Sequence, residues 1–401
     1  MRRISGEATV PSADVAGRVL LATTVDLKSN GIGALFLRDL MASQSDFGFL
    51  VHVEPPFLMG GGAAASSPSP VRLLRATSSH LPGFHSVRLC WFRQFLLGKR
   101  TAAIASATDK AQAECIWVTA SSVEMIWIGE QLAALGRDVR VTVWDSPEYL
   151  AKNLRLPLAL RAAIGKSFSH LLRKARAVSV IGRAMQRDYL QRYGVASEII
   201  RHGIATDHDL SERGHGMYGP IRIVFAGSLY SKKEWNSFTE ALEAADWRIG
   251  GRPVLLHFMG RFPLSGANKP GEVVFLGEKP FDEALRIMAA MDIGYLPYWF
   301  DRSHELVART SFPGKLSAYA ATGLAVFHHA PSYTEATAFL AHYPFGLACP
   351  SLKAGEIIHA LGRLVTLAAT KECRAAQQAA LRDELSREAM ASRFRRFLAS
   401  A

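Results

Sequence analysis

Short apolar runs alternate with longer amphipathic segments along most of the chain. In the first half, the apolar runs have the length and composition of buried strands: RVLLATTV (18–25), FGFLVHV (47–53), VRLLRAT (71–77), CIWVT (115–119), VRVTV (139–143) and AVSVI (177–181). Apolar residues recur at helical spacing between several of these runs, over 33–41, 122–135 and 183–193. Strands separated by helices predict right-handed crossovers and a parallel sheet covered on both faces.

A polar, glycine-rich stretch, HGIATDHDLSERGHGMYGP (202–220), interrupts this alternation and predicts a linker. Beyond it, strands are expected at 221–227, 253–260, 272–277, 292–297 and 324–329, and helices at 235–245, 281–290, 314–322, 333–341 and 353–369. The sequence therefore predicts two doubly wound, Rossmann-like α/β domains, over 18–205 and 220–385. Because such sheets bind ligands at the carboxyl ends of their strands, we expect the main cleft between the two domains.

Three further segments fall outside this alternation. Residues 1–17 begin with two arginines but lack the apolar core of a signal peptide, which predicts a disordered tail. The stretch MGGGAAASSPSP (59–70) is typical of a loop, and both a linker and a lid over the cleft fit it. The final segment, 386–401, carries a basic amphipathic helix that we expect to return to the first domain.

Composition narrows the class of protein. The chain has 401 residues, 49% of them hydrophobic, and a formal net charge of +12, which suggests an anionic partner: nucleic acid, a membrane surface or a phosphorylated substrate. No uncharged apolar run approaches the roughly 20 residues of a spanning helix, so we expect a cytoplasmic protein. The cysteines lie far apart and the histidines lack metal-binding spacing, which predicts small buried thiols and no metal site: Cys90, Cys115, Cys349 and Cys373.

Basic residues concentrate in the first domain. Between Ala151 and Arg187 there are nine basic residues and no acidic one, and RLCWFRQFLLGKR (88–100) interleaves aromatic residues with four cations. Without a nucleic-acid-binding motif, this pattern favours a membrane contact through 88–100 and 151–187 on the inner membrane face, and no nucleic-acid partner. The alternative is that the aromatic residues pack into the domain core.

Two strand-to-helix turns have the small residues that a phosphate site requires. In VDLKSNGIGALF, Gly31 and Gly33 precede or open a helix, although G-x-G without a third glycine also fits a plain tight turn. In FAGSLYSKKEW, Gly227 and Ser228 can expose backbone amides and Lys233 can reach an anion. Two solvated lysines at a helix start are the alternative there.

The segment ARTSFPGKLSAYAATGLAVFHHAPSY (308–333) carries the strongest signal. Thr310 and Ser311 precede a proline at a helix start, and Lys315 falls in the first turn. A lysine is unfavourable beside a positive helix end unless an anion is near, which favours phosphate binding over a plain exposed lysine. Elsewhere, Asp145 follows the strand VRVTV, where both a catalytic acid and a helix N-cap fit.

Together these motifs resemble the GT-B superfamily of nucleotide-sugar glycosyltransferases, in particular its group-1, family-4-like bacterial branch. SFPGKLSAYAATGLAV resembles that branch's "P-x-K-L-x-E-Y-x-A-x-G-x-P-V" segment, FAGSLYSKKEW its phosphate loop, VHVEPP (51–56) its second strand and RHGI (201–204) its interdomain segment. The resemblance implies a retaining, metal-independent hexosyltransferase that uses a nucleotide-sugar donor and a glycan or lipid-linked acceptor in surface polysaccharide synthesis.

The resemblance also implies roles for individual residues. The diphosphate and adjoining sugar would be held by Gly227, Ser228, Lys233, Thr310, Ser311, Lys315 and Leu316, with Lys233 and Lys315 as the catalytic cations. Gly31 and Gly33 would line the cleft opposite, and Asp145 would lie near the transferred sugar or the acceptor.

The chain departs from the family pattern at several positions. Ser228 replaces an arginine, and Thr310 and Ala318 replace the two glutamates, of which the second normally binds the ribose. A second hypothesis therefore stands beside the enzyme: a non-catalytic GT-B protein that binds a sugar nucleotide or assembles with an active transferase.

Overall fold

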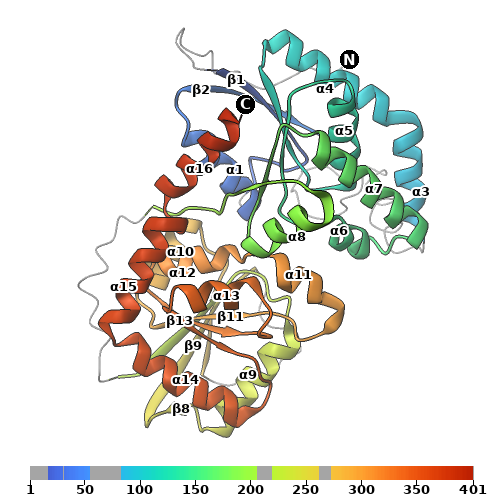
Figure 1. Ribbon diagram of the computed structural model, residues 1–401. Helices are drawn as coiled ribbons and strands as arrows, with labels where there is room; N and C mark the ends of the chain where they lie inside the picture. The colour runs from blue at the N-terminus through green and yellow to red at the C-terminus, as the bar shows by residue number, and fades with distance from the viewer. Residues whose placement is uncertain (1–16, 30, 55–82, 206–218, 262–271, 401) are drawn as a thin grey trace. The chain divides into compact units, whose positions relative to one another are not determined.

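The structure, a computed structural model, describes residues 17–29, 31–54, 83–205, 219–261 and 272–400 (Figure 1). It divides into two compact units. Unit 1 comprises residues up to Ile181, Gln186–Ile200 and Arg393–Ala401, and unit 2 comprises Gly182–Met185 and Arg201–Ser392. Residues 1–16 of the predicted tail, the loop 59–70, the strand 71–77 and most of the linker 202–220 lie outside the described residues. Gly17, the last residue assigned to the tail, instead begins the first strand.

Unit 1 is built on a six-stranded parallel sheet in the order β2-β1-β3-β4-β5-β6. The strand order reverses beside β1, which pairs with both β2 and β3, as expected for a doubly wound sheet. Its strands are β1 (Gly17–Thr23), β2 (Phe47–Val53), β3 (Cys115–Thr119), β4 (Val139–Thr142), β5 (Ala177–Val180) and β6 (Glu198–Ile199).

Helices lie on both sides of this sheet (Figure 1). They are α1 (Ile32–Ala42), α3 (Phe84–Trp91), a π-helical stretch (Phe92–Leu96) continuing into α4 (Leu97–Ala111), α5 (Val123–Ala134), α6 (Pro147–Asn153), α7 (Leu158–Lys174), α8 (Arg183–Tyr193) and α16 (Arg387–Ala399). Helix α5 is buried along nearly its whole length because α4 and α7 both pack against it.

The end of α16 completes the core of unit 1. The Phe394 ring lies 4.7 Å from the Trp117 ring on β3 and stacks on Phe49 of β2 at 6.2 Å between ring centres. Arg140 on β4 donates to the carbonyl of Phe397 at 3.1 Å. The last residues of the chain are therefore an integral part of the first unit, although their neighbours in sequence belong to the second.

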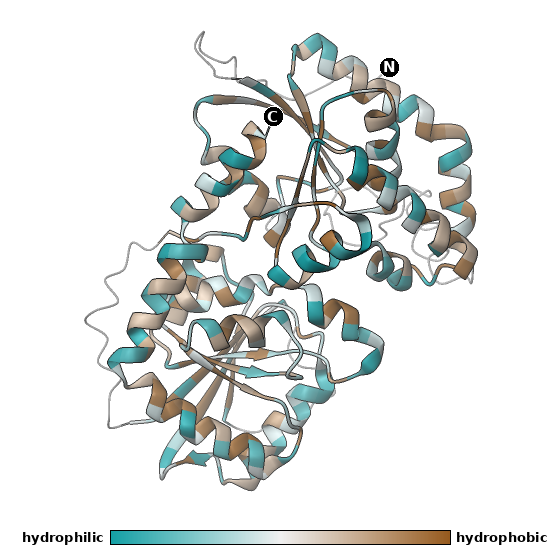
Figure 2. Cartoon of the chain, viewed as in Figure 1, coloured by the Kyte–Doolittle hydropathy of each residue, from teal (hydrophilic) through white to brown (hydrophobic). Residues whose placement is uncertain are grey.

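Unit 2 contains a second parallel sheet in the order β10-β9-β7-β11-β12-β13, with β8 added antiparallel to β9. Its strands are largely hydrophobic, as expected for strands covered on both faces (Figure 2). They are β7 (Ile221–Ala226), β8 (Arg248–Ile249), β9 (Arg252–Met259), β10 (Val273–Gly277), β11 (Ile293–Pro297), β12 (Ala325–His329) and β13 (Gly346–Cys349).

The helices of unit 2 follow the same alternation. They are α9 (Lys232–Ala244), α10 (Phe281–Ala289), a 3₁₀ turn (Arg302–His304), α11 (Glu305–Thr310), α12 (Gly314–Ala321), α13 (Glu335–His342), α14 (Ala354–Ala368), α15 (Lys371–Ala380) and a π-helical stretch (Leu381–Leu385). Two parallel sheets covered by helices confirm the predicted α/β class. One expectation was wrong: Cys90 is exposed, because it lies on the outer side of α3, while the other three cysteines are buried.

Candidate functional site

Tyr319 fixes helix α12 to the sheet of unit 2. Its hydroxyl donates to the carbonyl of Tyr295 on β11 at 3.1 Å and accepts from the N–H of Ala226 at the end of β7 at 3.4 Å. Its ring fills the space beside Gly294, where a Cβ would come within 2.5 Å of the ring. Glycine at this position of β11 therefore lets α12 approach the sheet closely.

Lys315 precedes Tyr319 by four residues, so it lies on the same face of α12 and one turn nearer the N-terminus. Because Tyr319 contacts the end of β7, Lys315 reaches Gly227, the residue that follows this strand. A Cβ on Gly227 would lie 3.2 Å from Cε and 3.6 Å from Nζ of Lys315. The structure thus brings together two candidate residues from separate segments of the sequence.

The Lys315 ammonium lies over two aromatic rings. Its Nζ is 5.2 Å from the centre of the Phe225 ring and 4.9 Å from that of Tyr230. Lys315 makes no ion pair with any described residue, and desolvation by burial lowers its pKa from 10.5 to about 8. The rings attract a cation but do not neutralise it. Lys315 also lies in the first turn of α12, so the site favours an anion.

The turn after β7 lies against the Lys315 side chain, and the region formed by this turn and the start of α12 is called the phosphate-type site below. Gly227 has a φ of +97°, and its N–H donates to the carbonyl of Met259 at 2.7 Å. Ser228 is exposed, and Lys233 is exposed in the first turn of α9. Ser231, the N-cap residue of α9, is buried, and its hydroxyl has no hydrogen-bond partner within the described chain. Lys233 therefore remains on the surface of the unit, while Lys315 is only partly exposed.

The residues before α12 differ in what they can offer a ligand. Thr310 is buried and its hydroxyl donates to the carbonyl of Leu306 at 2.8 Å. Ser311 is partly exposed in an extended conformation between α11 and α12. Leu316 is fully buried and its N–H donates to the carbonyl of Pro313 at 2.9 Å. Leu316 thus contributes to the core, and Ser311 is the accessible hydroxyl.

A buried ionic network lies beneath the start of α12. The Arg201 guanidinium is 4.2 Å from the centre of the Phe312 ring, two residues before α12, and pairs with Glu335 at 3.0 Å and with Glu384. Glu335 also accepts hydrogen bonds from the first two N–H groups of α8, at 2.6 and 2.9 Å. Arg201 is 1% exposed, so its two carboxylates compensate a charge that water does not reach.

In unit 1, the structure connects Asp145 with Gly33 through one side chain. A Cβ on Gly33 would lie 3.2 Å from the ring of Trp144, which precedes Asp145 at the carboxyl end of β4. Burial raises the pKa of Asp145, and this carboxylate has no ion pair with a described residue. Ser146, not Asp145, caps α6 by accepting from the N–H of Tyr149 at 3.2 Å. Gly31 is the exposed N-cap residue of α1.

Sequence reasoning missed the aromatic side of the phosphate-type site. Tyr230 lies against Trp299, with 4.7 Å between ring centres, and the indole N–H of Trp299 donates to the carbonyl of Tyr230 at 3.1 Å. The only sequence signal is the position of Tyr230 and Trp299 just after strands β7 and β11.

Within the described residues, there is no group of three His, Cys, Asp or Glu side chains able to hold a metal. Of the helices described, none is long and apolar enough to cross a bilayer.

No protein-family model matches this chain, and no curated protein matches it in sequence. Solved structures match it across nearly its whole length. Sucrose-phosphate synthase from Thermosynechococcus elongatus superimposes with a TM-score of 0.64 at 15% identity, covering 96% of this chain and 100% of that one. The HepE protein of Anabaena, in complex with UDP and glucose, gives 0.60 at 14% identity, with coverages of 96% and 100%.

α,α-Trehalose 6-phosphate synthase from Burkholderia multivorans gives a TM-score of 0.60 at 13% identity, and covers 96% of this chain and 98% of its own. These neighbours are GT-B glycosyltransferases. The likeness establishes the GT-B fold that the sequence predicted, with two Rossmann-like units in one chain.

Proposed function

We propose that this chain is a glycosyltransferase that takes a sugar from a nucleotide-sugar donor. The observation that carries the proposal is the Lys315 ammonium, which has no ion pair with a described residue and lies against Gly227 at the start of α12. A diphosphate would supply the missing negative charge and would accept hydrogen bonds from the ammonium and from the hydroxyls of Ser228 and Ser311.

The chemistry of the site fits departure of a nucleoside diphosphate. In the transfer, the bond between the anomeric carbon and the diphosphate oxygen breaks, and an acceptor hydroxyl forms the new glycosidic bond and loses its proton. Negative charge grows on the leaving diphosphate, which Lys315 stabilises electrostatically without a metal. Asp145, a partly buried carboxylate with a raised pKa, is the candidate for receiving the acceptor proton in unit 1. Retention of the anomeric configuration belongs to the same proposal.

The structural neighbours support the class of donor. The HepE protein is described in complexes with UDP-glucose and with UDP, and a trehalose-phosphate synthase of Burkholderia vietnamiensis is described as UDP-forming. Each description concerns that protein. For this chain, a uridine nucleotide is accordingly the first donor to test.

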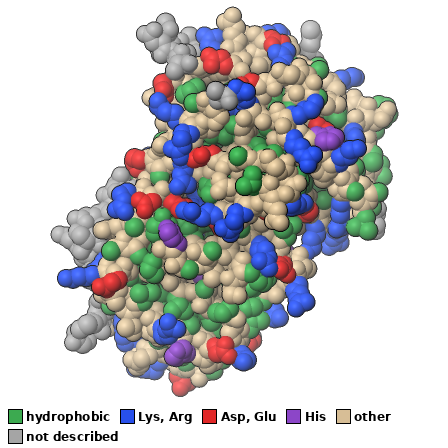
Figure 3. All heavy atoms as spheres, viewed as in Figure 1, with side chains coloured by type: hydrophobic (Ala, Val, Ile, Leu, Met, Phe, Trp, Pro, Cys, Tyr) green, Lys and Arg blue, Asp and Glu red, His purple; other side chains and the backbone are tan. Residues whose placement is uncertain are grey.

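The acceptor side of the proposal rests on unit 1. Val87, Trp91 and Phe95 recur at i, i+4 and i+8 along α3 and its π-helical continuation, and they are 70%, 46% and 57% exposed. The sequence from Gly83 to Thr108 contains four cations and no acidic residue. Such a surface favours a glycan or lipid-linked acceptor at an anionic membrane face. Over the face drawn in Figure 3, basic side chains are spread across both units.

A second candidate function, a non-catalytic sugar-nucleotide-binding protein, is favoured by one observation. Ala318 lies one turn after Lys315 on α12, where the family carries the carboxylate that binds the ribose. Without it the chain would bind a nucleotide through the diphosphate alone. Turnover of a donor separates this candidate from the enzyme.

The test is a thermal-shift panel of UDP, GDP and ADP on the full chain, with and without EDTA. We expect one nucleotide to raise Tm in the wild type, and Lys315→Met to remove that rise. Lys371→Met is the matched control because Lys371 is an exposed lysine in the first turn of α15, in the same unit. No Tm response to any nucleotide, or an equal response in Lys315→Met, contradicts the proposal.

A further inference from the structure

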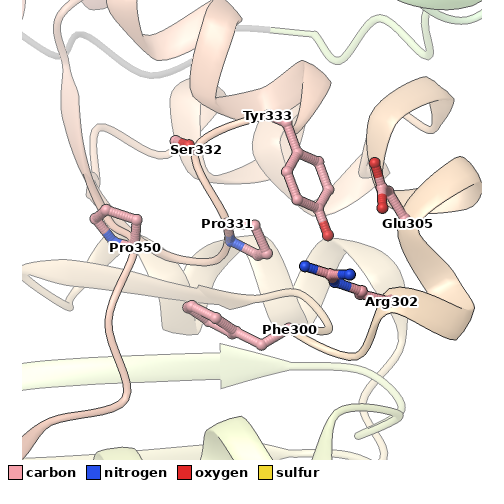
Figure 4. A pocket seen from close by; sticks show the side chains of 7 residues that line it. All are labelled: Phe300, Arg302, Glu305, Pro331, Ser332, Tyr333 and Pro350. Carbon is pink, nitrogen blue, oxygen red and sulfur yellow. The ribbon is translucent and has the colours of Figure 1, made fainter.

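A second concave site lies in unit 2, and neither Lys315 nor Gly227 lines it. It is a pocket of about 410 Å³ where the loops after β11, β12 and β13 converge (Figure 4). The loop after β11 contributes Phe300 and Arg302, the loop after β12 contributes Pro331, Ser332 and Tyr333, and Pro350 follows β13. These three strands are neighbours in the sheet, so the pocket occupies the edge where α/β folds bind ligands.

One wall of the pocket is apolar and held in place. The N–H of Phe300 donates to the buried carboxylate of Glu234 at 2.8 Å, and its ring meets the ring of His329 edge-on at 5.6 Å. His329 is itself fixed by a 2.8 Å contact of Nε2 with the carbonyl of Ser351. With Pro331 and Pro350 beside it, Phe300 offers a flat apolar surface of the kind that packs against the face of a sugar ring.

The opposite side is polar, and its charges do not cancel. Glu305 pairs with Arg309 at 2.8 Å, and the Arg309 guanidinium lies 4.8 Å from the centre of the Tyr333 ring. Arg302 makes no ion pair with any described residue. The neighbouring Asp301 carboxylate accepts instead from the N–H and hydroxyl of Ser303, at 2.8 and 2.9 Å. The Arg302 guanidinium is therefore the uncompensated charge of the pocket.

The polar groups face one another across the pocket. Figure 4 shows the Tyr333 hydroxyl directed toward the Arg302 guanidinium, with Glu305 beside Tyr333. Burial, and then the Glu305 carboxylate, raise the pKa of Tyr333, so the phenol stays neutral and can donate a hydrogen bond at physiological pH. A ligand here meets an apolar face on one side and a cation, a hydroxyl donor and a carboxylate acceptor on the other.

We propose that this pocket binds a monosaccharide that carries an anionic group, a phosphate or a carboxylate. Arg302 binds the anion, Tyr333 and Glu305 bind ring hydroxyls, and Phe300 packs against the apolar face of the ring. The volume accommodates one sugar ring with one substituent. The site is separate from the diphosphate site of Lys315, so it stands whether or not the chain transfers a sugar.

The experiment uses isothermal titration calorimetry on the full chain to compare two variants that should have opposite effects on two ligands. Its probes are glucose 6-phosphate, glucuronate, glucose, inorganic phosphate and UDP. We expect one of the two anionic sugars to bind, and Arg302→Gln to weaken that binding at least tenfold while leaving UDP binding unchanged. Tyr333→Phe should weaken it severalfold. Lys315→Met should do the reverse, weakening UDP and sparing the sugar. Arg363→Gln, an exposed arginine on α14, is the matched control.

Three outcomes overturn the proposal. The first is that neither anionic sugar binds to wild-type protein whose Tm shows that it is folded. The second is that sugar binding is lost in Lys315→Met but not in Arg302→Gln, which places the sugar in the site of Lys315. The third is that a part of the ligand binds as tightly as the whole. If inorganic phosphate binds as tightly as glucose 6-phosphate, the pocket does not recognise the sugar; if glucose binds as tightly as glucuronate, it does not recognise the anion. If Arg302→Gln lowers Tm, Tyr333→Phe decides, since it keeps the ring and removes only the hydroxyl.

Discussion

The side chain of Lys315 passes directly over Gly227, where a Cβ would lie 3.2 Å from its Cε. This contact joins the turn after β7 to the start of α12 and leaves the ammonium over the rings of Phe225 and Tyr230. The position of the Lys315 ammonium therefore depends on the absence of a side chain at position 227. The φ of +97° at Gly227 gives a second reason for glycine there.

Replacing Gly227 by alanine should separate these two effects. The left-handed backbone alone costs about 1 kcal/mol, while the added Cβ also moves Lys315 away from its position. We expect Gly227→Ala to lower Tm and to weaken UDP binding at least tenfold. Gly250→Ala is the control, because Gly250 has a φ of +58° and open space around its Cβ position. An equal loss of UDP binding in both variants would contradict a direct role for Gly227.

The pH dependence of nucleotide binding should follow Lys315. Its pKa of about 8 means that the ammonium is lost above pH 8, and a bound diphosphate favours the protonated form. We expect UDP affinity to fall about fivefold between pH 8 and pH 9, measured by titration calorimetry with a proton taken up on binding. In Lys315→Met the affinity should be weak and flat over this range. A wild-type affinity that is constant to pH 10 contradicts the assignment.

The same shift has the opposite effect on folding. Because the folded pKa lies below the unfolded value of 10.5, the unfolded chain binds more protons between pH 8 and pH 10.5. The contribution of Lys315 to stability in the absence of ligand therefore increases with pH across this window. Binding and stability thus respond to pH in opposite directions, which distinguishes Lys315 from general alkaline unfolding.

The proximity of Gly227 and Lys315 could be anticipated from the sequence because the signals at each position are local, while diphosphate binding stays a prediction. Gly227 after a strand, and Pro313 with Lys315 at a helix start, each have a physical meaning within a few residues. What the sequence could not give are contacts that depend on tertiary packing. The Tyr319 ring beside Gly294 sets the distance of α12 from the sheet, and only this placement shows that Lys315 is partly buried against Gly227 while Lys233 is exposed.

The helices of unit 1 show a second limit. The basic segment 151–187 contains α7, whose apolar residues Ile164, Phe168 and Leu171 are buried, yet the number of cations obscured this helical pattern. In 88–100, the alternative of packing into the domain core holds for part of the segment, and the membrane contact stays a prediction. Phe92 and Leu97 are buried, while Trp91 and Phe95 are exposed. Whether a side chain of this segment faces the core or the solvent depends on the π-helical stretch between α3 and α4. The spacing of apolar residues does not reveal such a stretch.

Asp145→Asn tests the carboxylate of unit 1. Burial raises the pKa of Asp145, so its ionised form is disfavoured in the folded protein, and asparagine keeps the shape without the charge. The contribution of the aspartate to stability falls as pH rises through this raised pKa. We therefore expect Tm at pH 7 to stay equal or increase. UDP binding should be unchanged, and transferase activity should fall at least a hundredfold. A variant that retains activity removes Asp145 from the mechanism.

The Arg201 network should be important for unit 2 and for the start of α12. Arg201→Met leaves the buried carboxylates of Glu335 and Glu384 without their shared cation, at a cost of about 3–5 kcal/mol in the free energy of unfolding. Adding Glu384→Gln removes one of these charges and should recover part of the loss. Urea unfolding followed by tryptophan fluorescence measures both variants. A loss below about 1 kcal/mol in Arg201→Met would show that water reaches the network in solution.

The exposed apolar residues on α3 and its continuation predict binding to anionic membranes. We expect Trp91 and Phe95 to insert their rings at the interface and nearby cations such as Arg88 to interact with lipid phosphates. Vesicles containing phosphatidylglycerol should then bind the chain, and vesicles of phosphatidylcholine should not. The double variant Trp91→Ser/Phe95→Ser should reduce cosedimentation at least tenfold. The matched control, Leu135→Ser/Leu190→Ser, removes two exposed apolar side chains elsewhere in unit 1 and should leave binding unchanged. Equal binding by the two double variants would assign the attraction to net charge alone, and high salt would then abolish it completely.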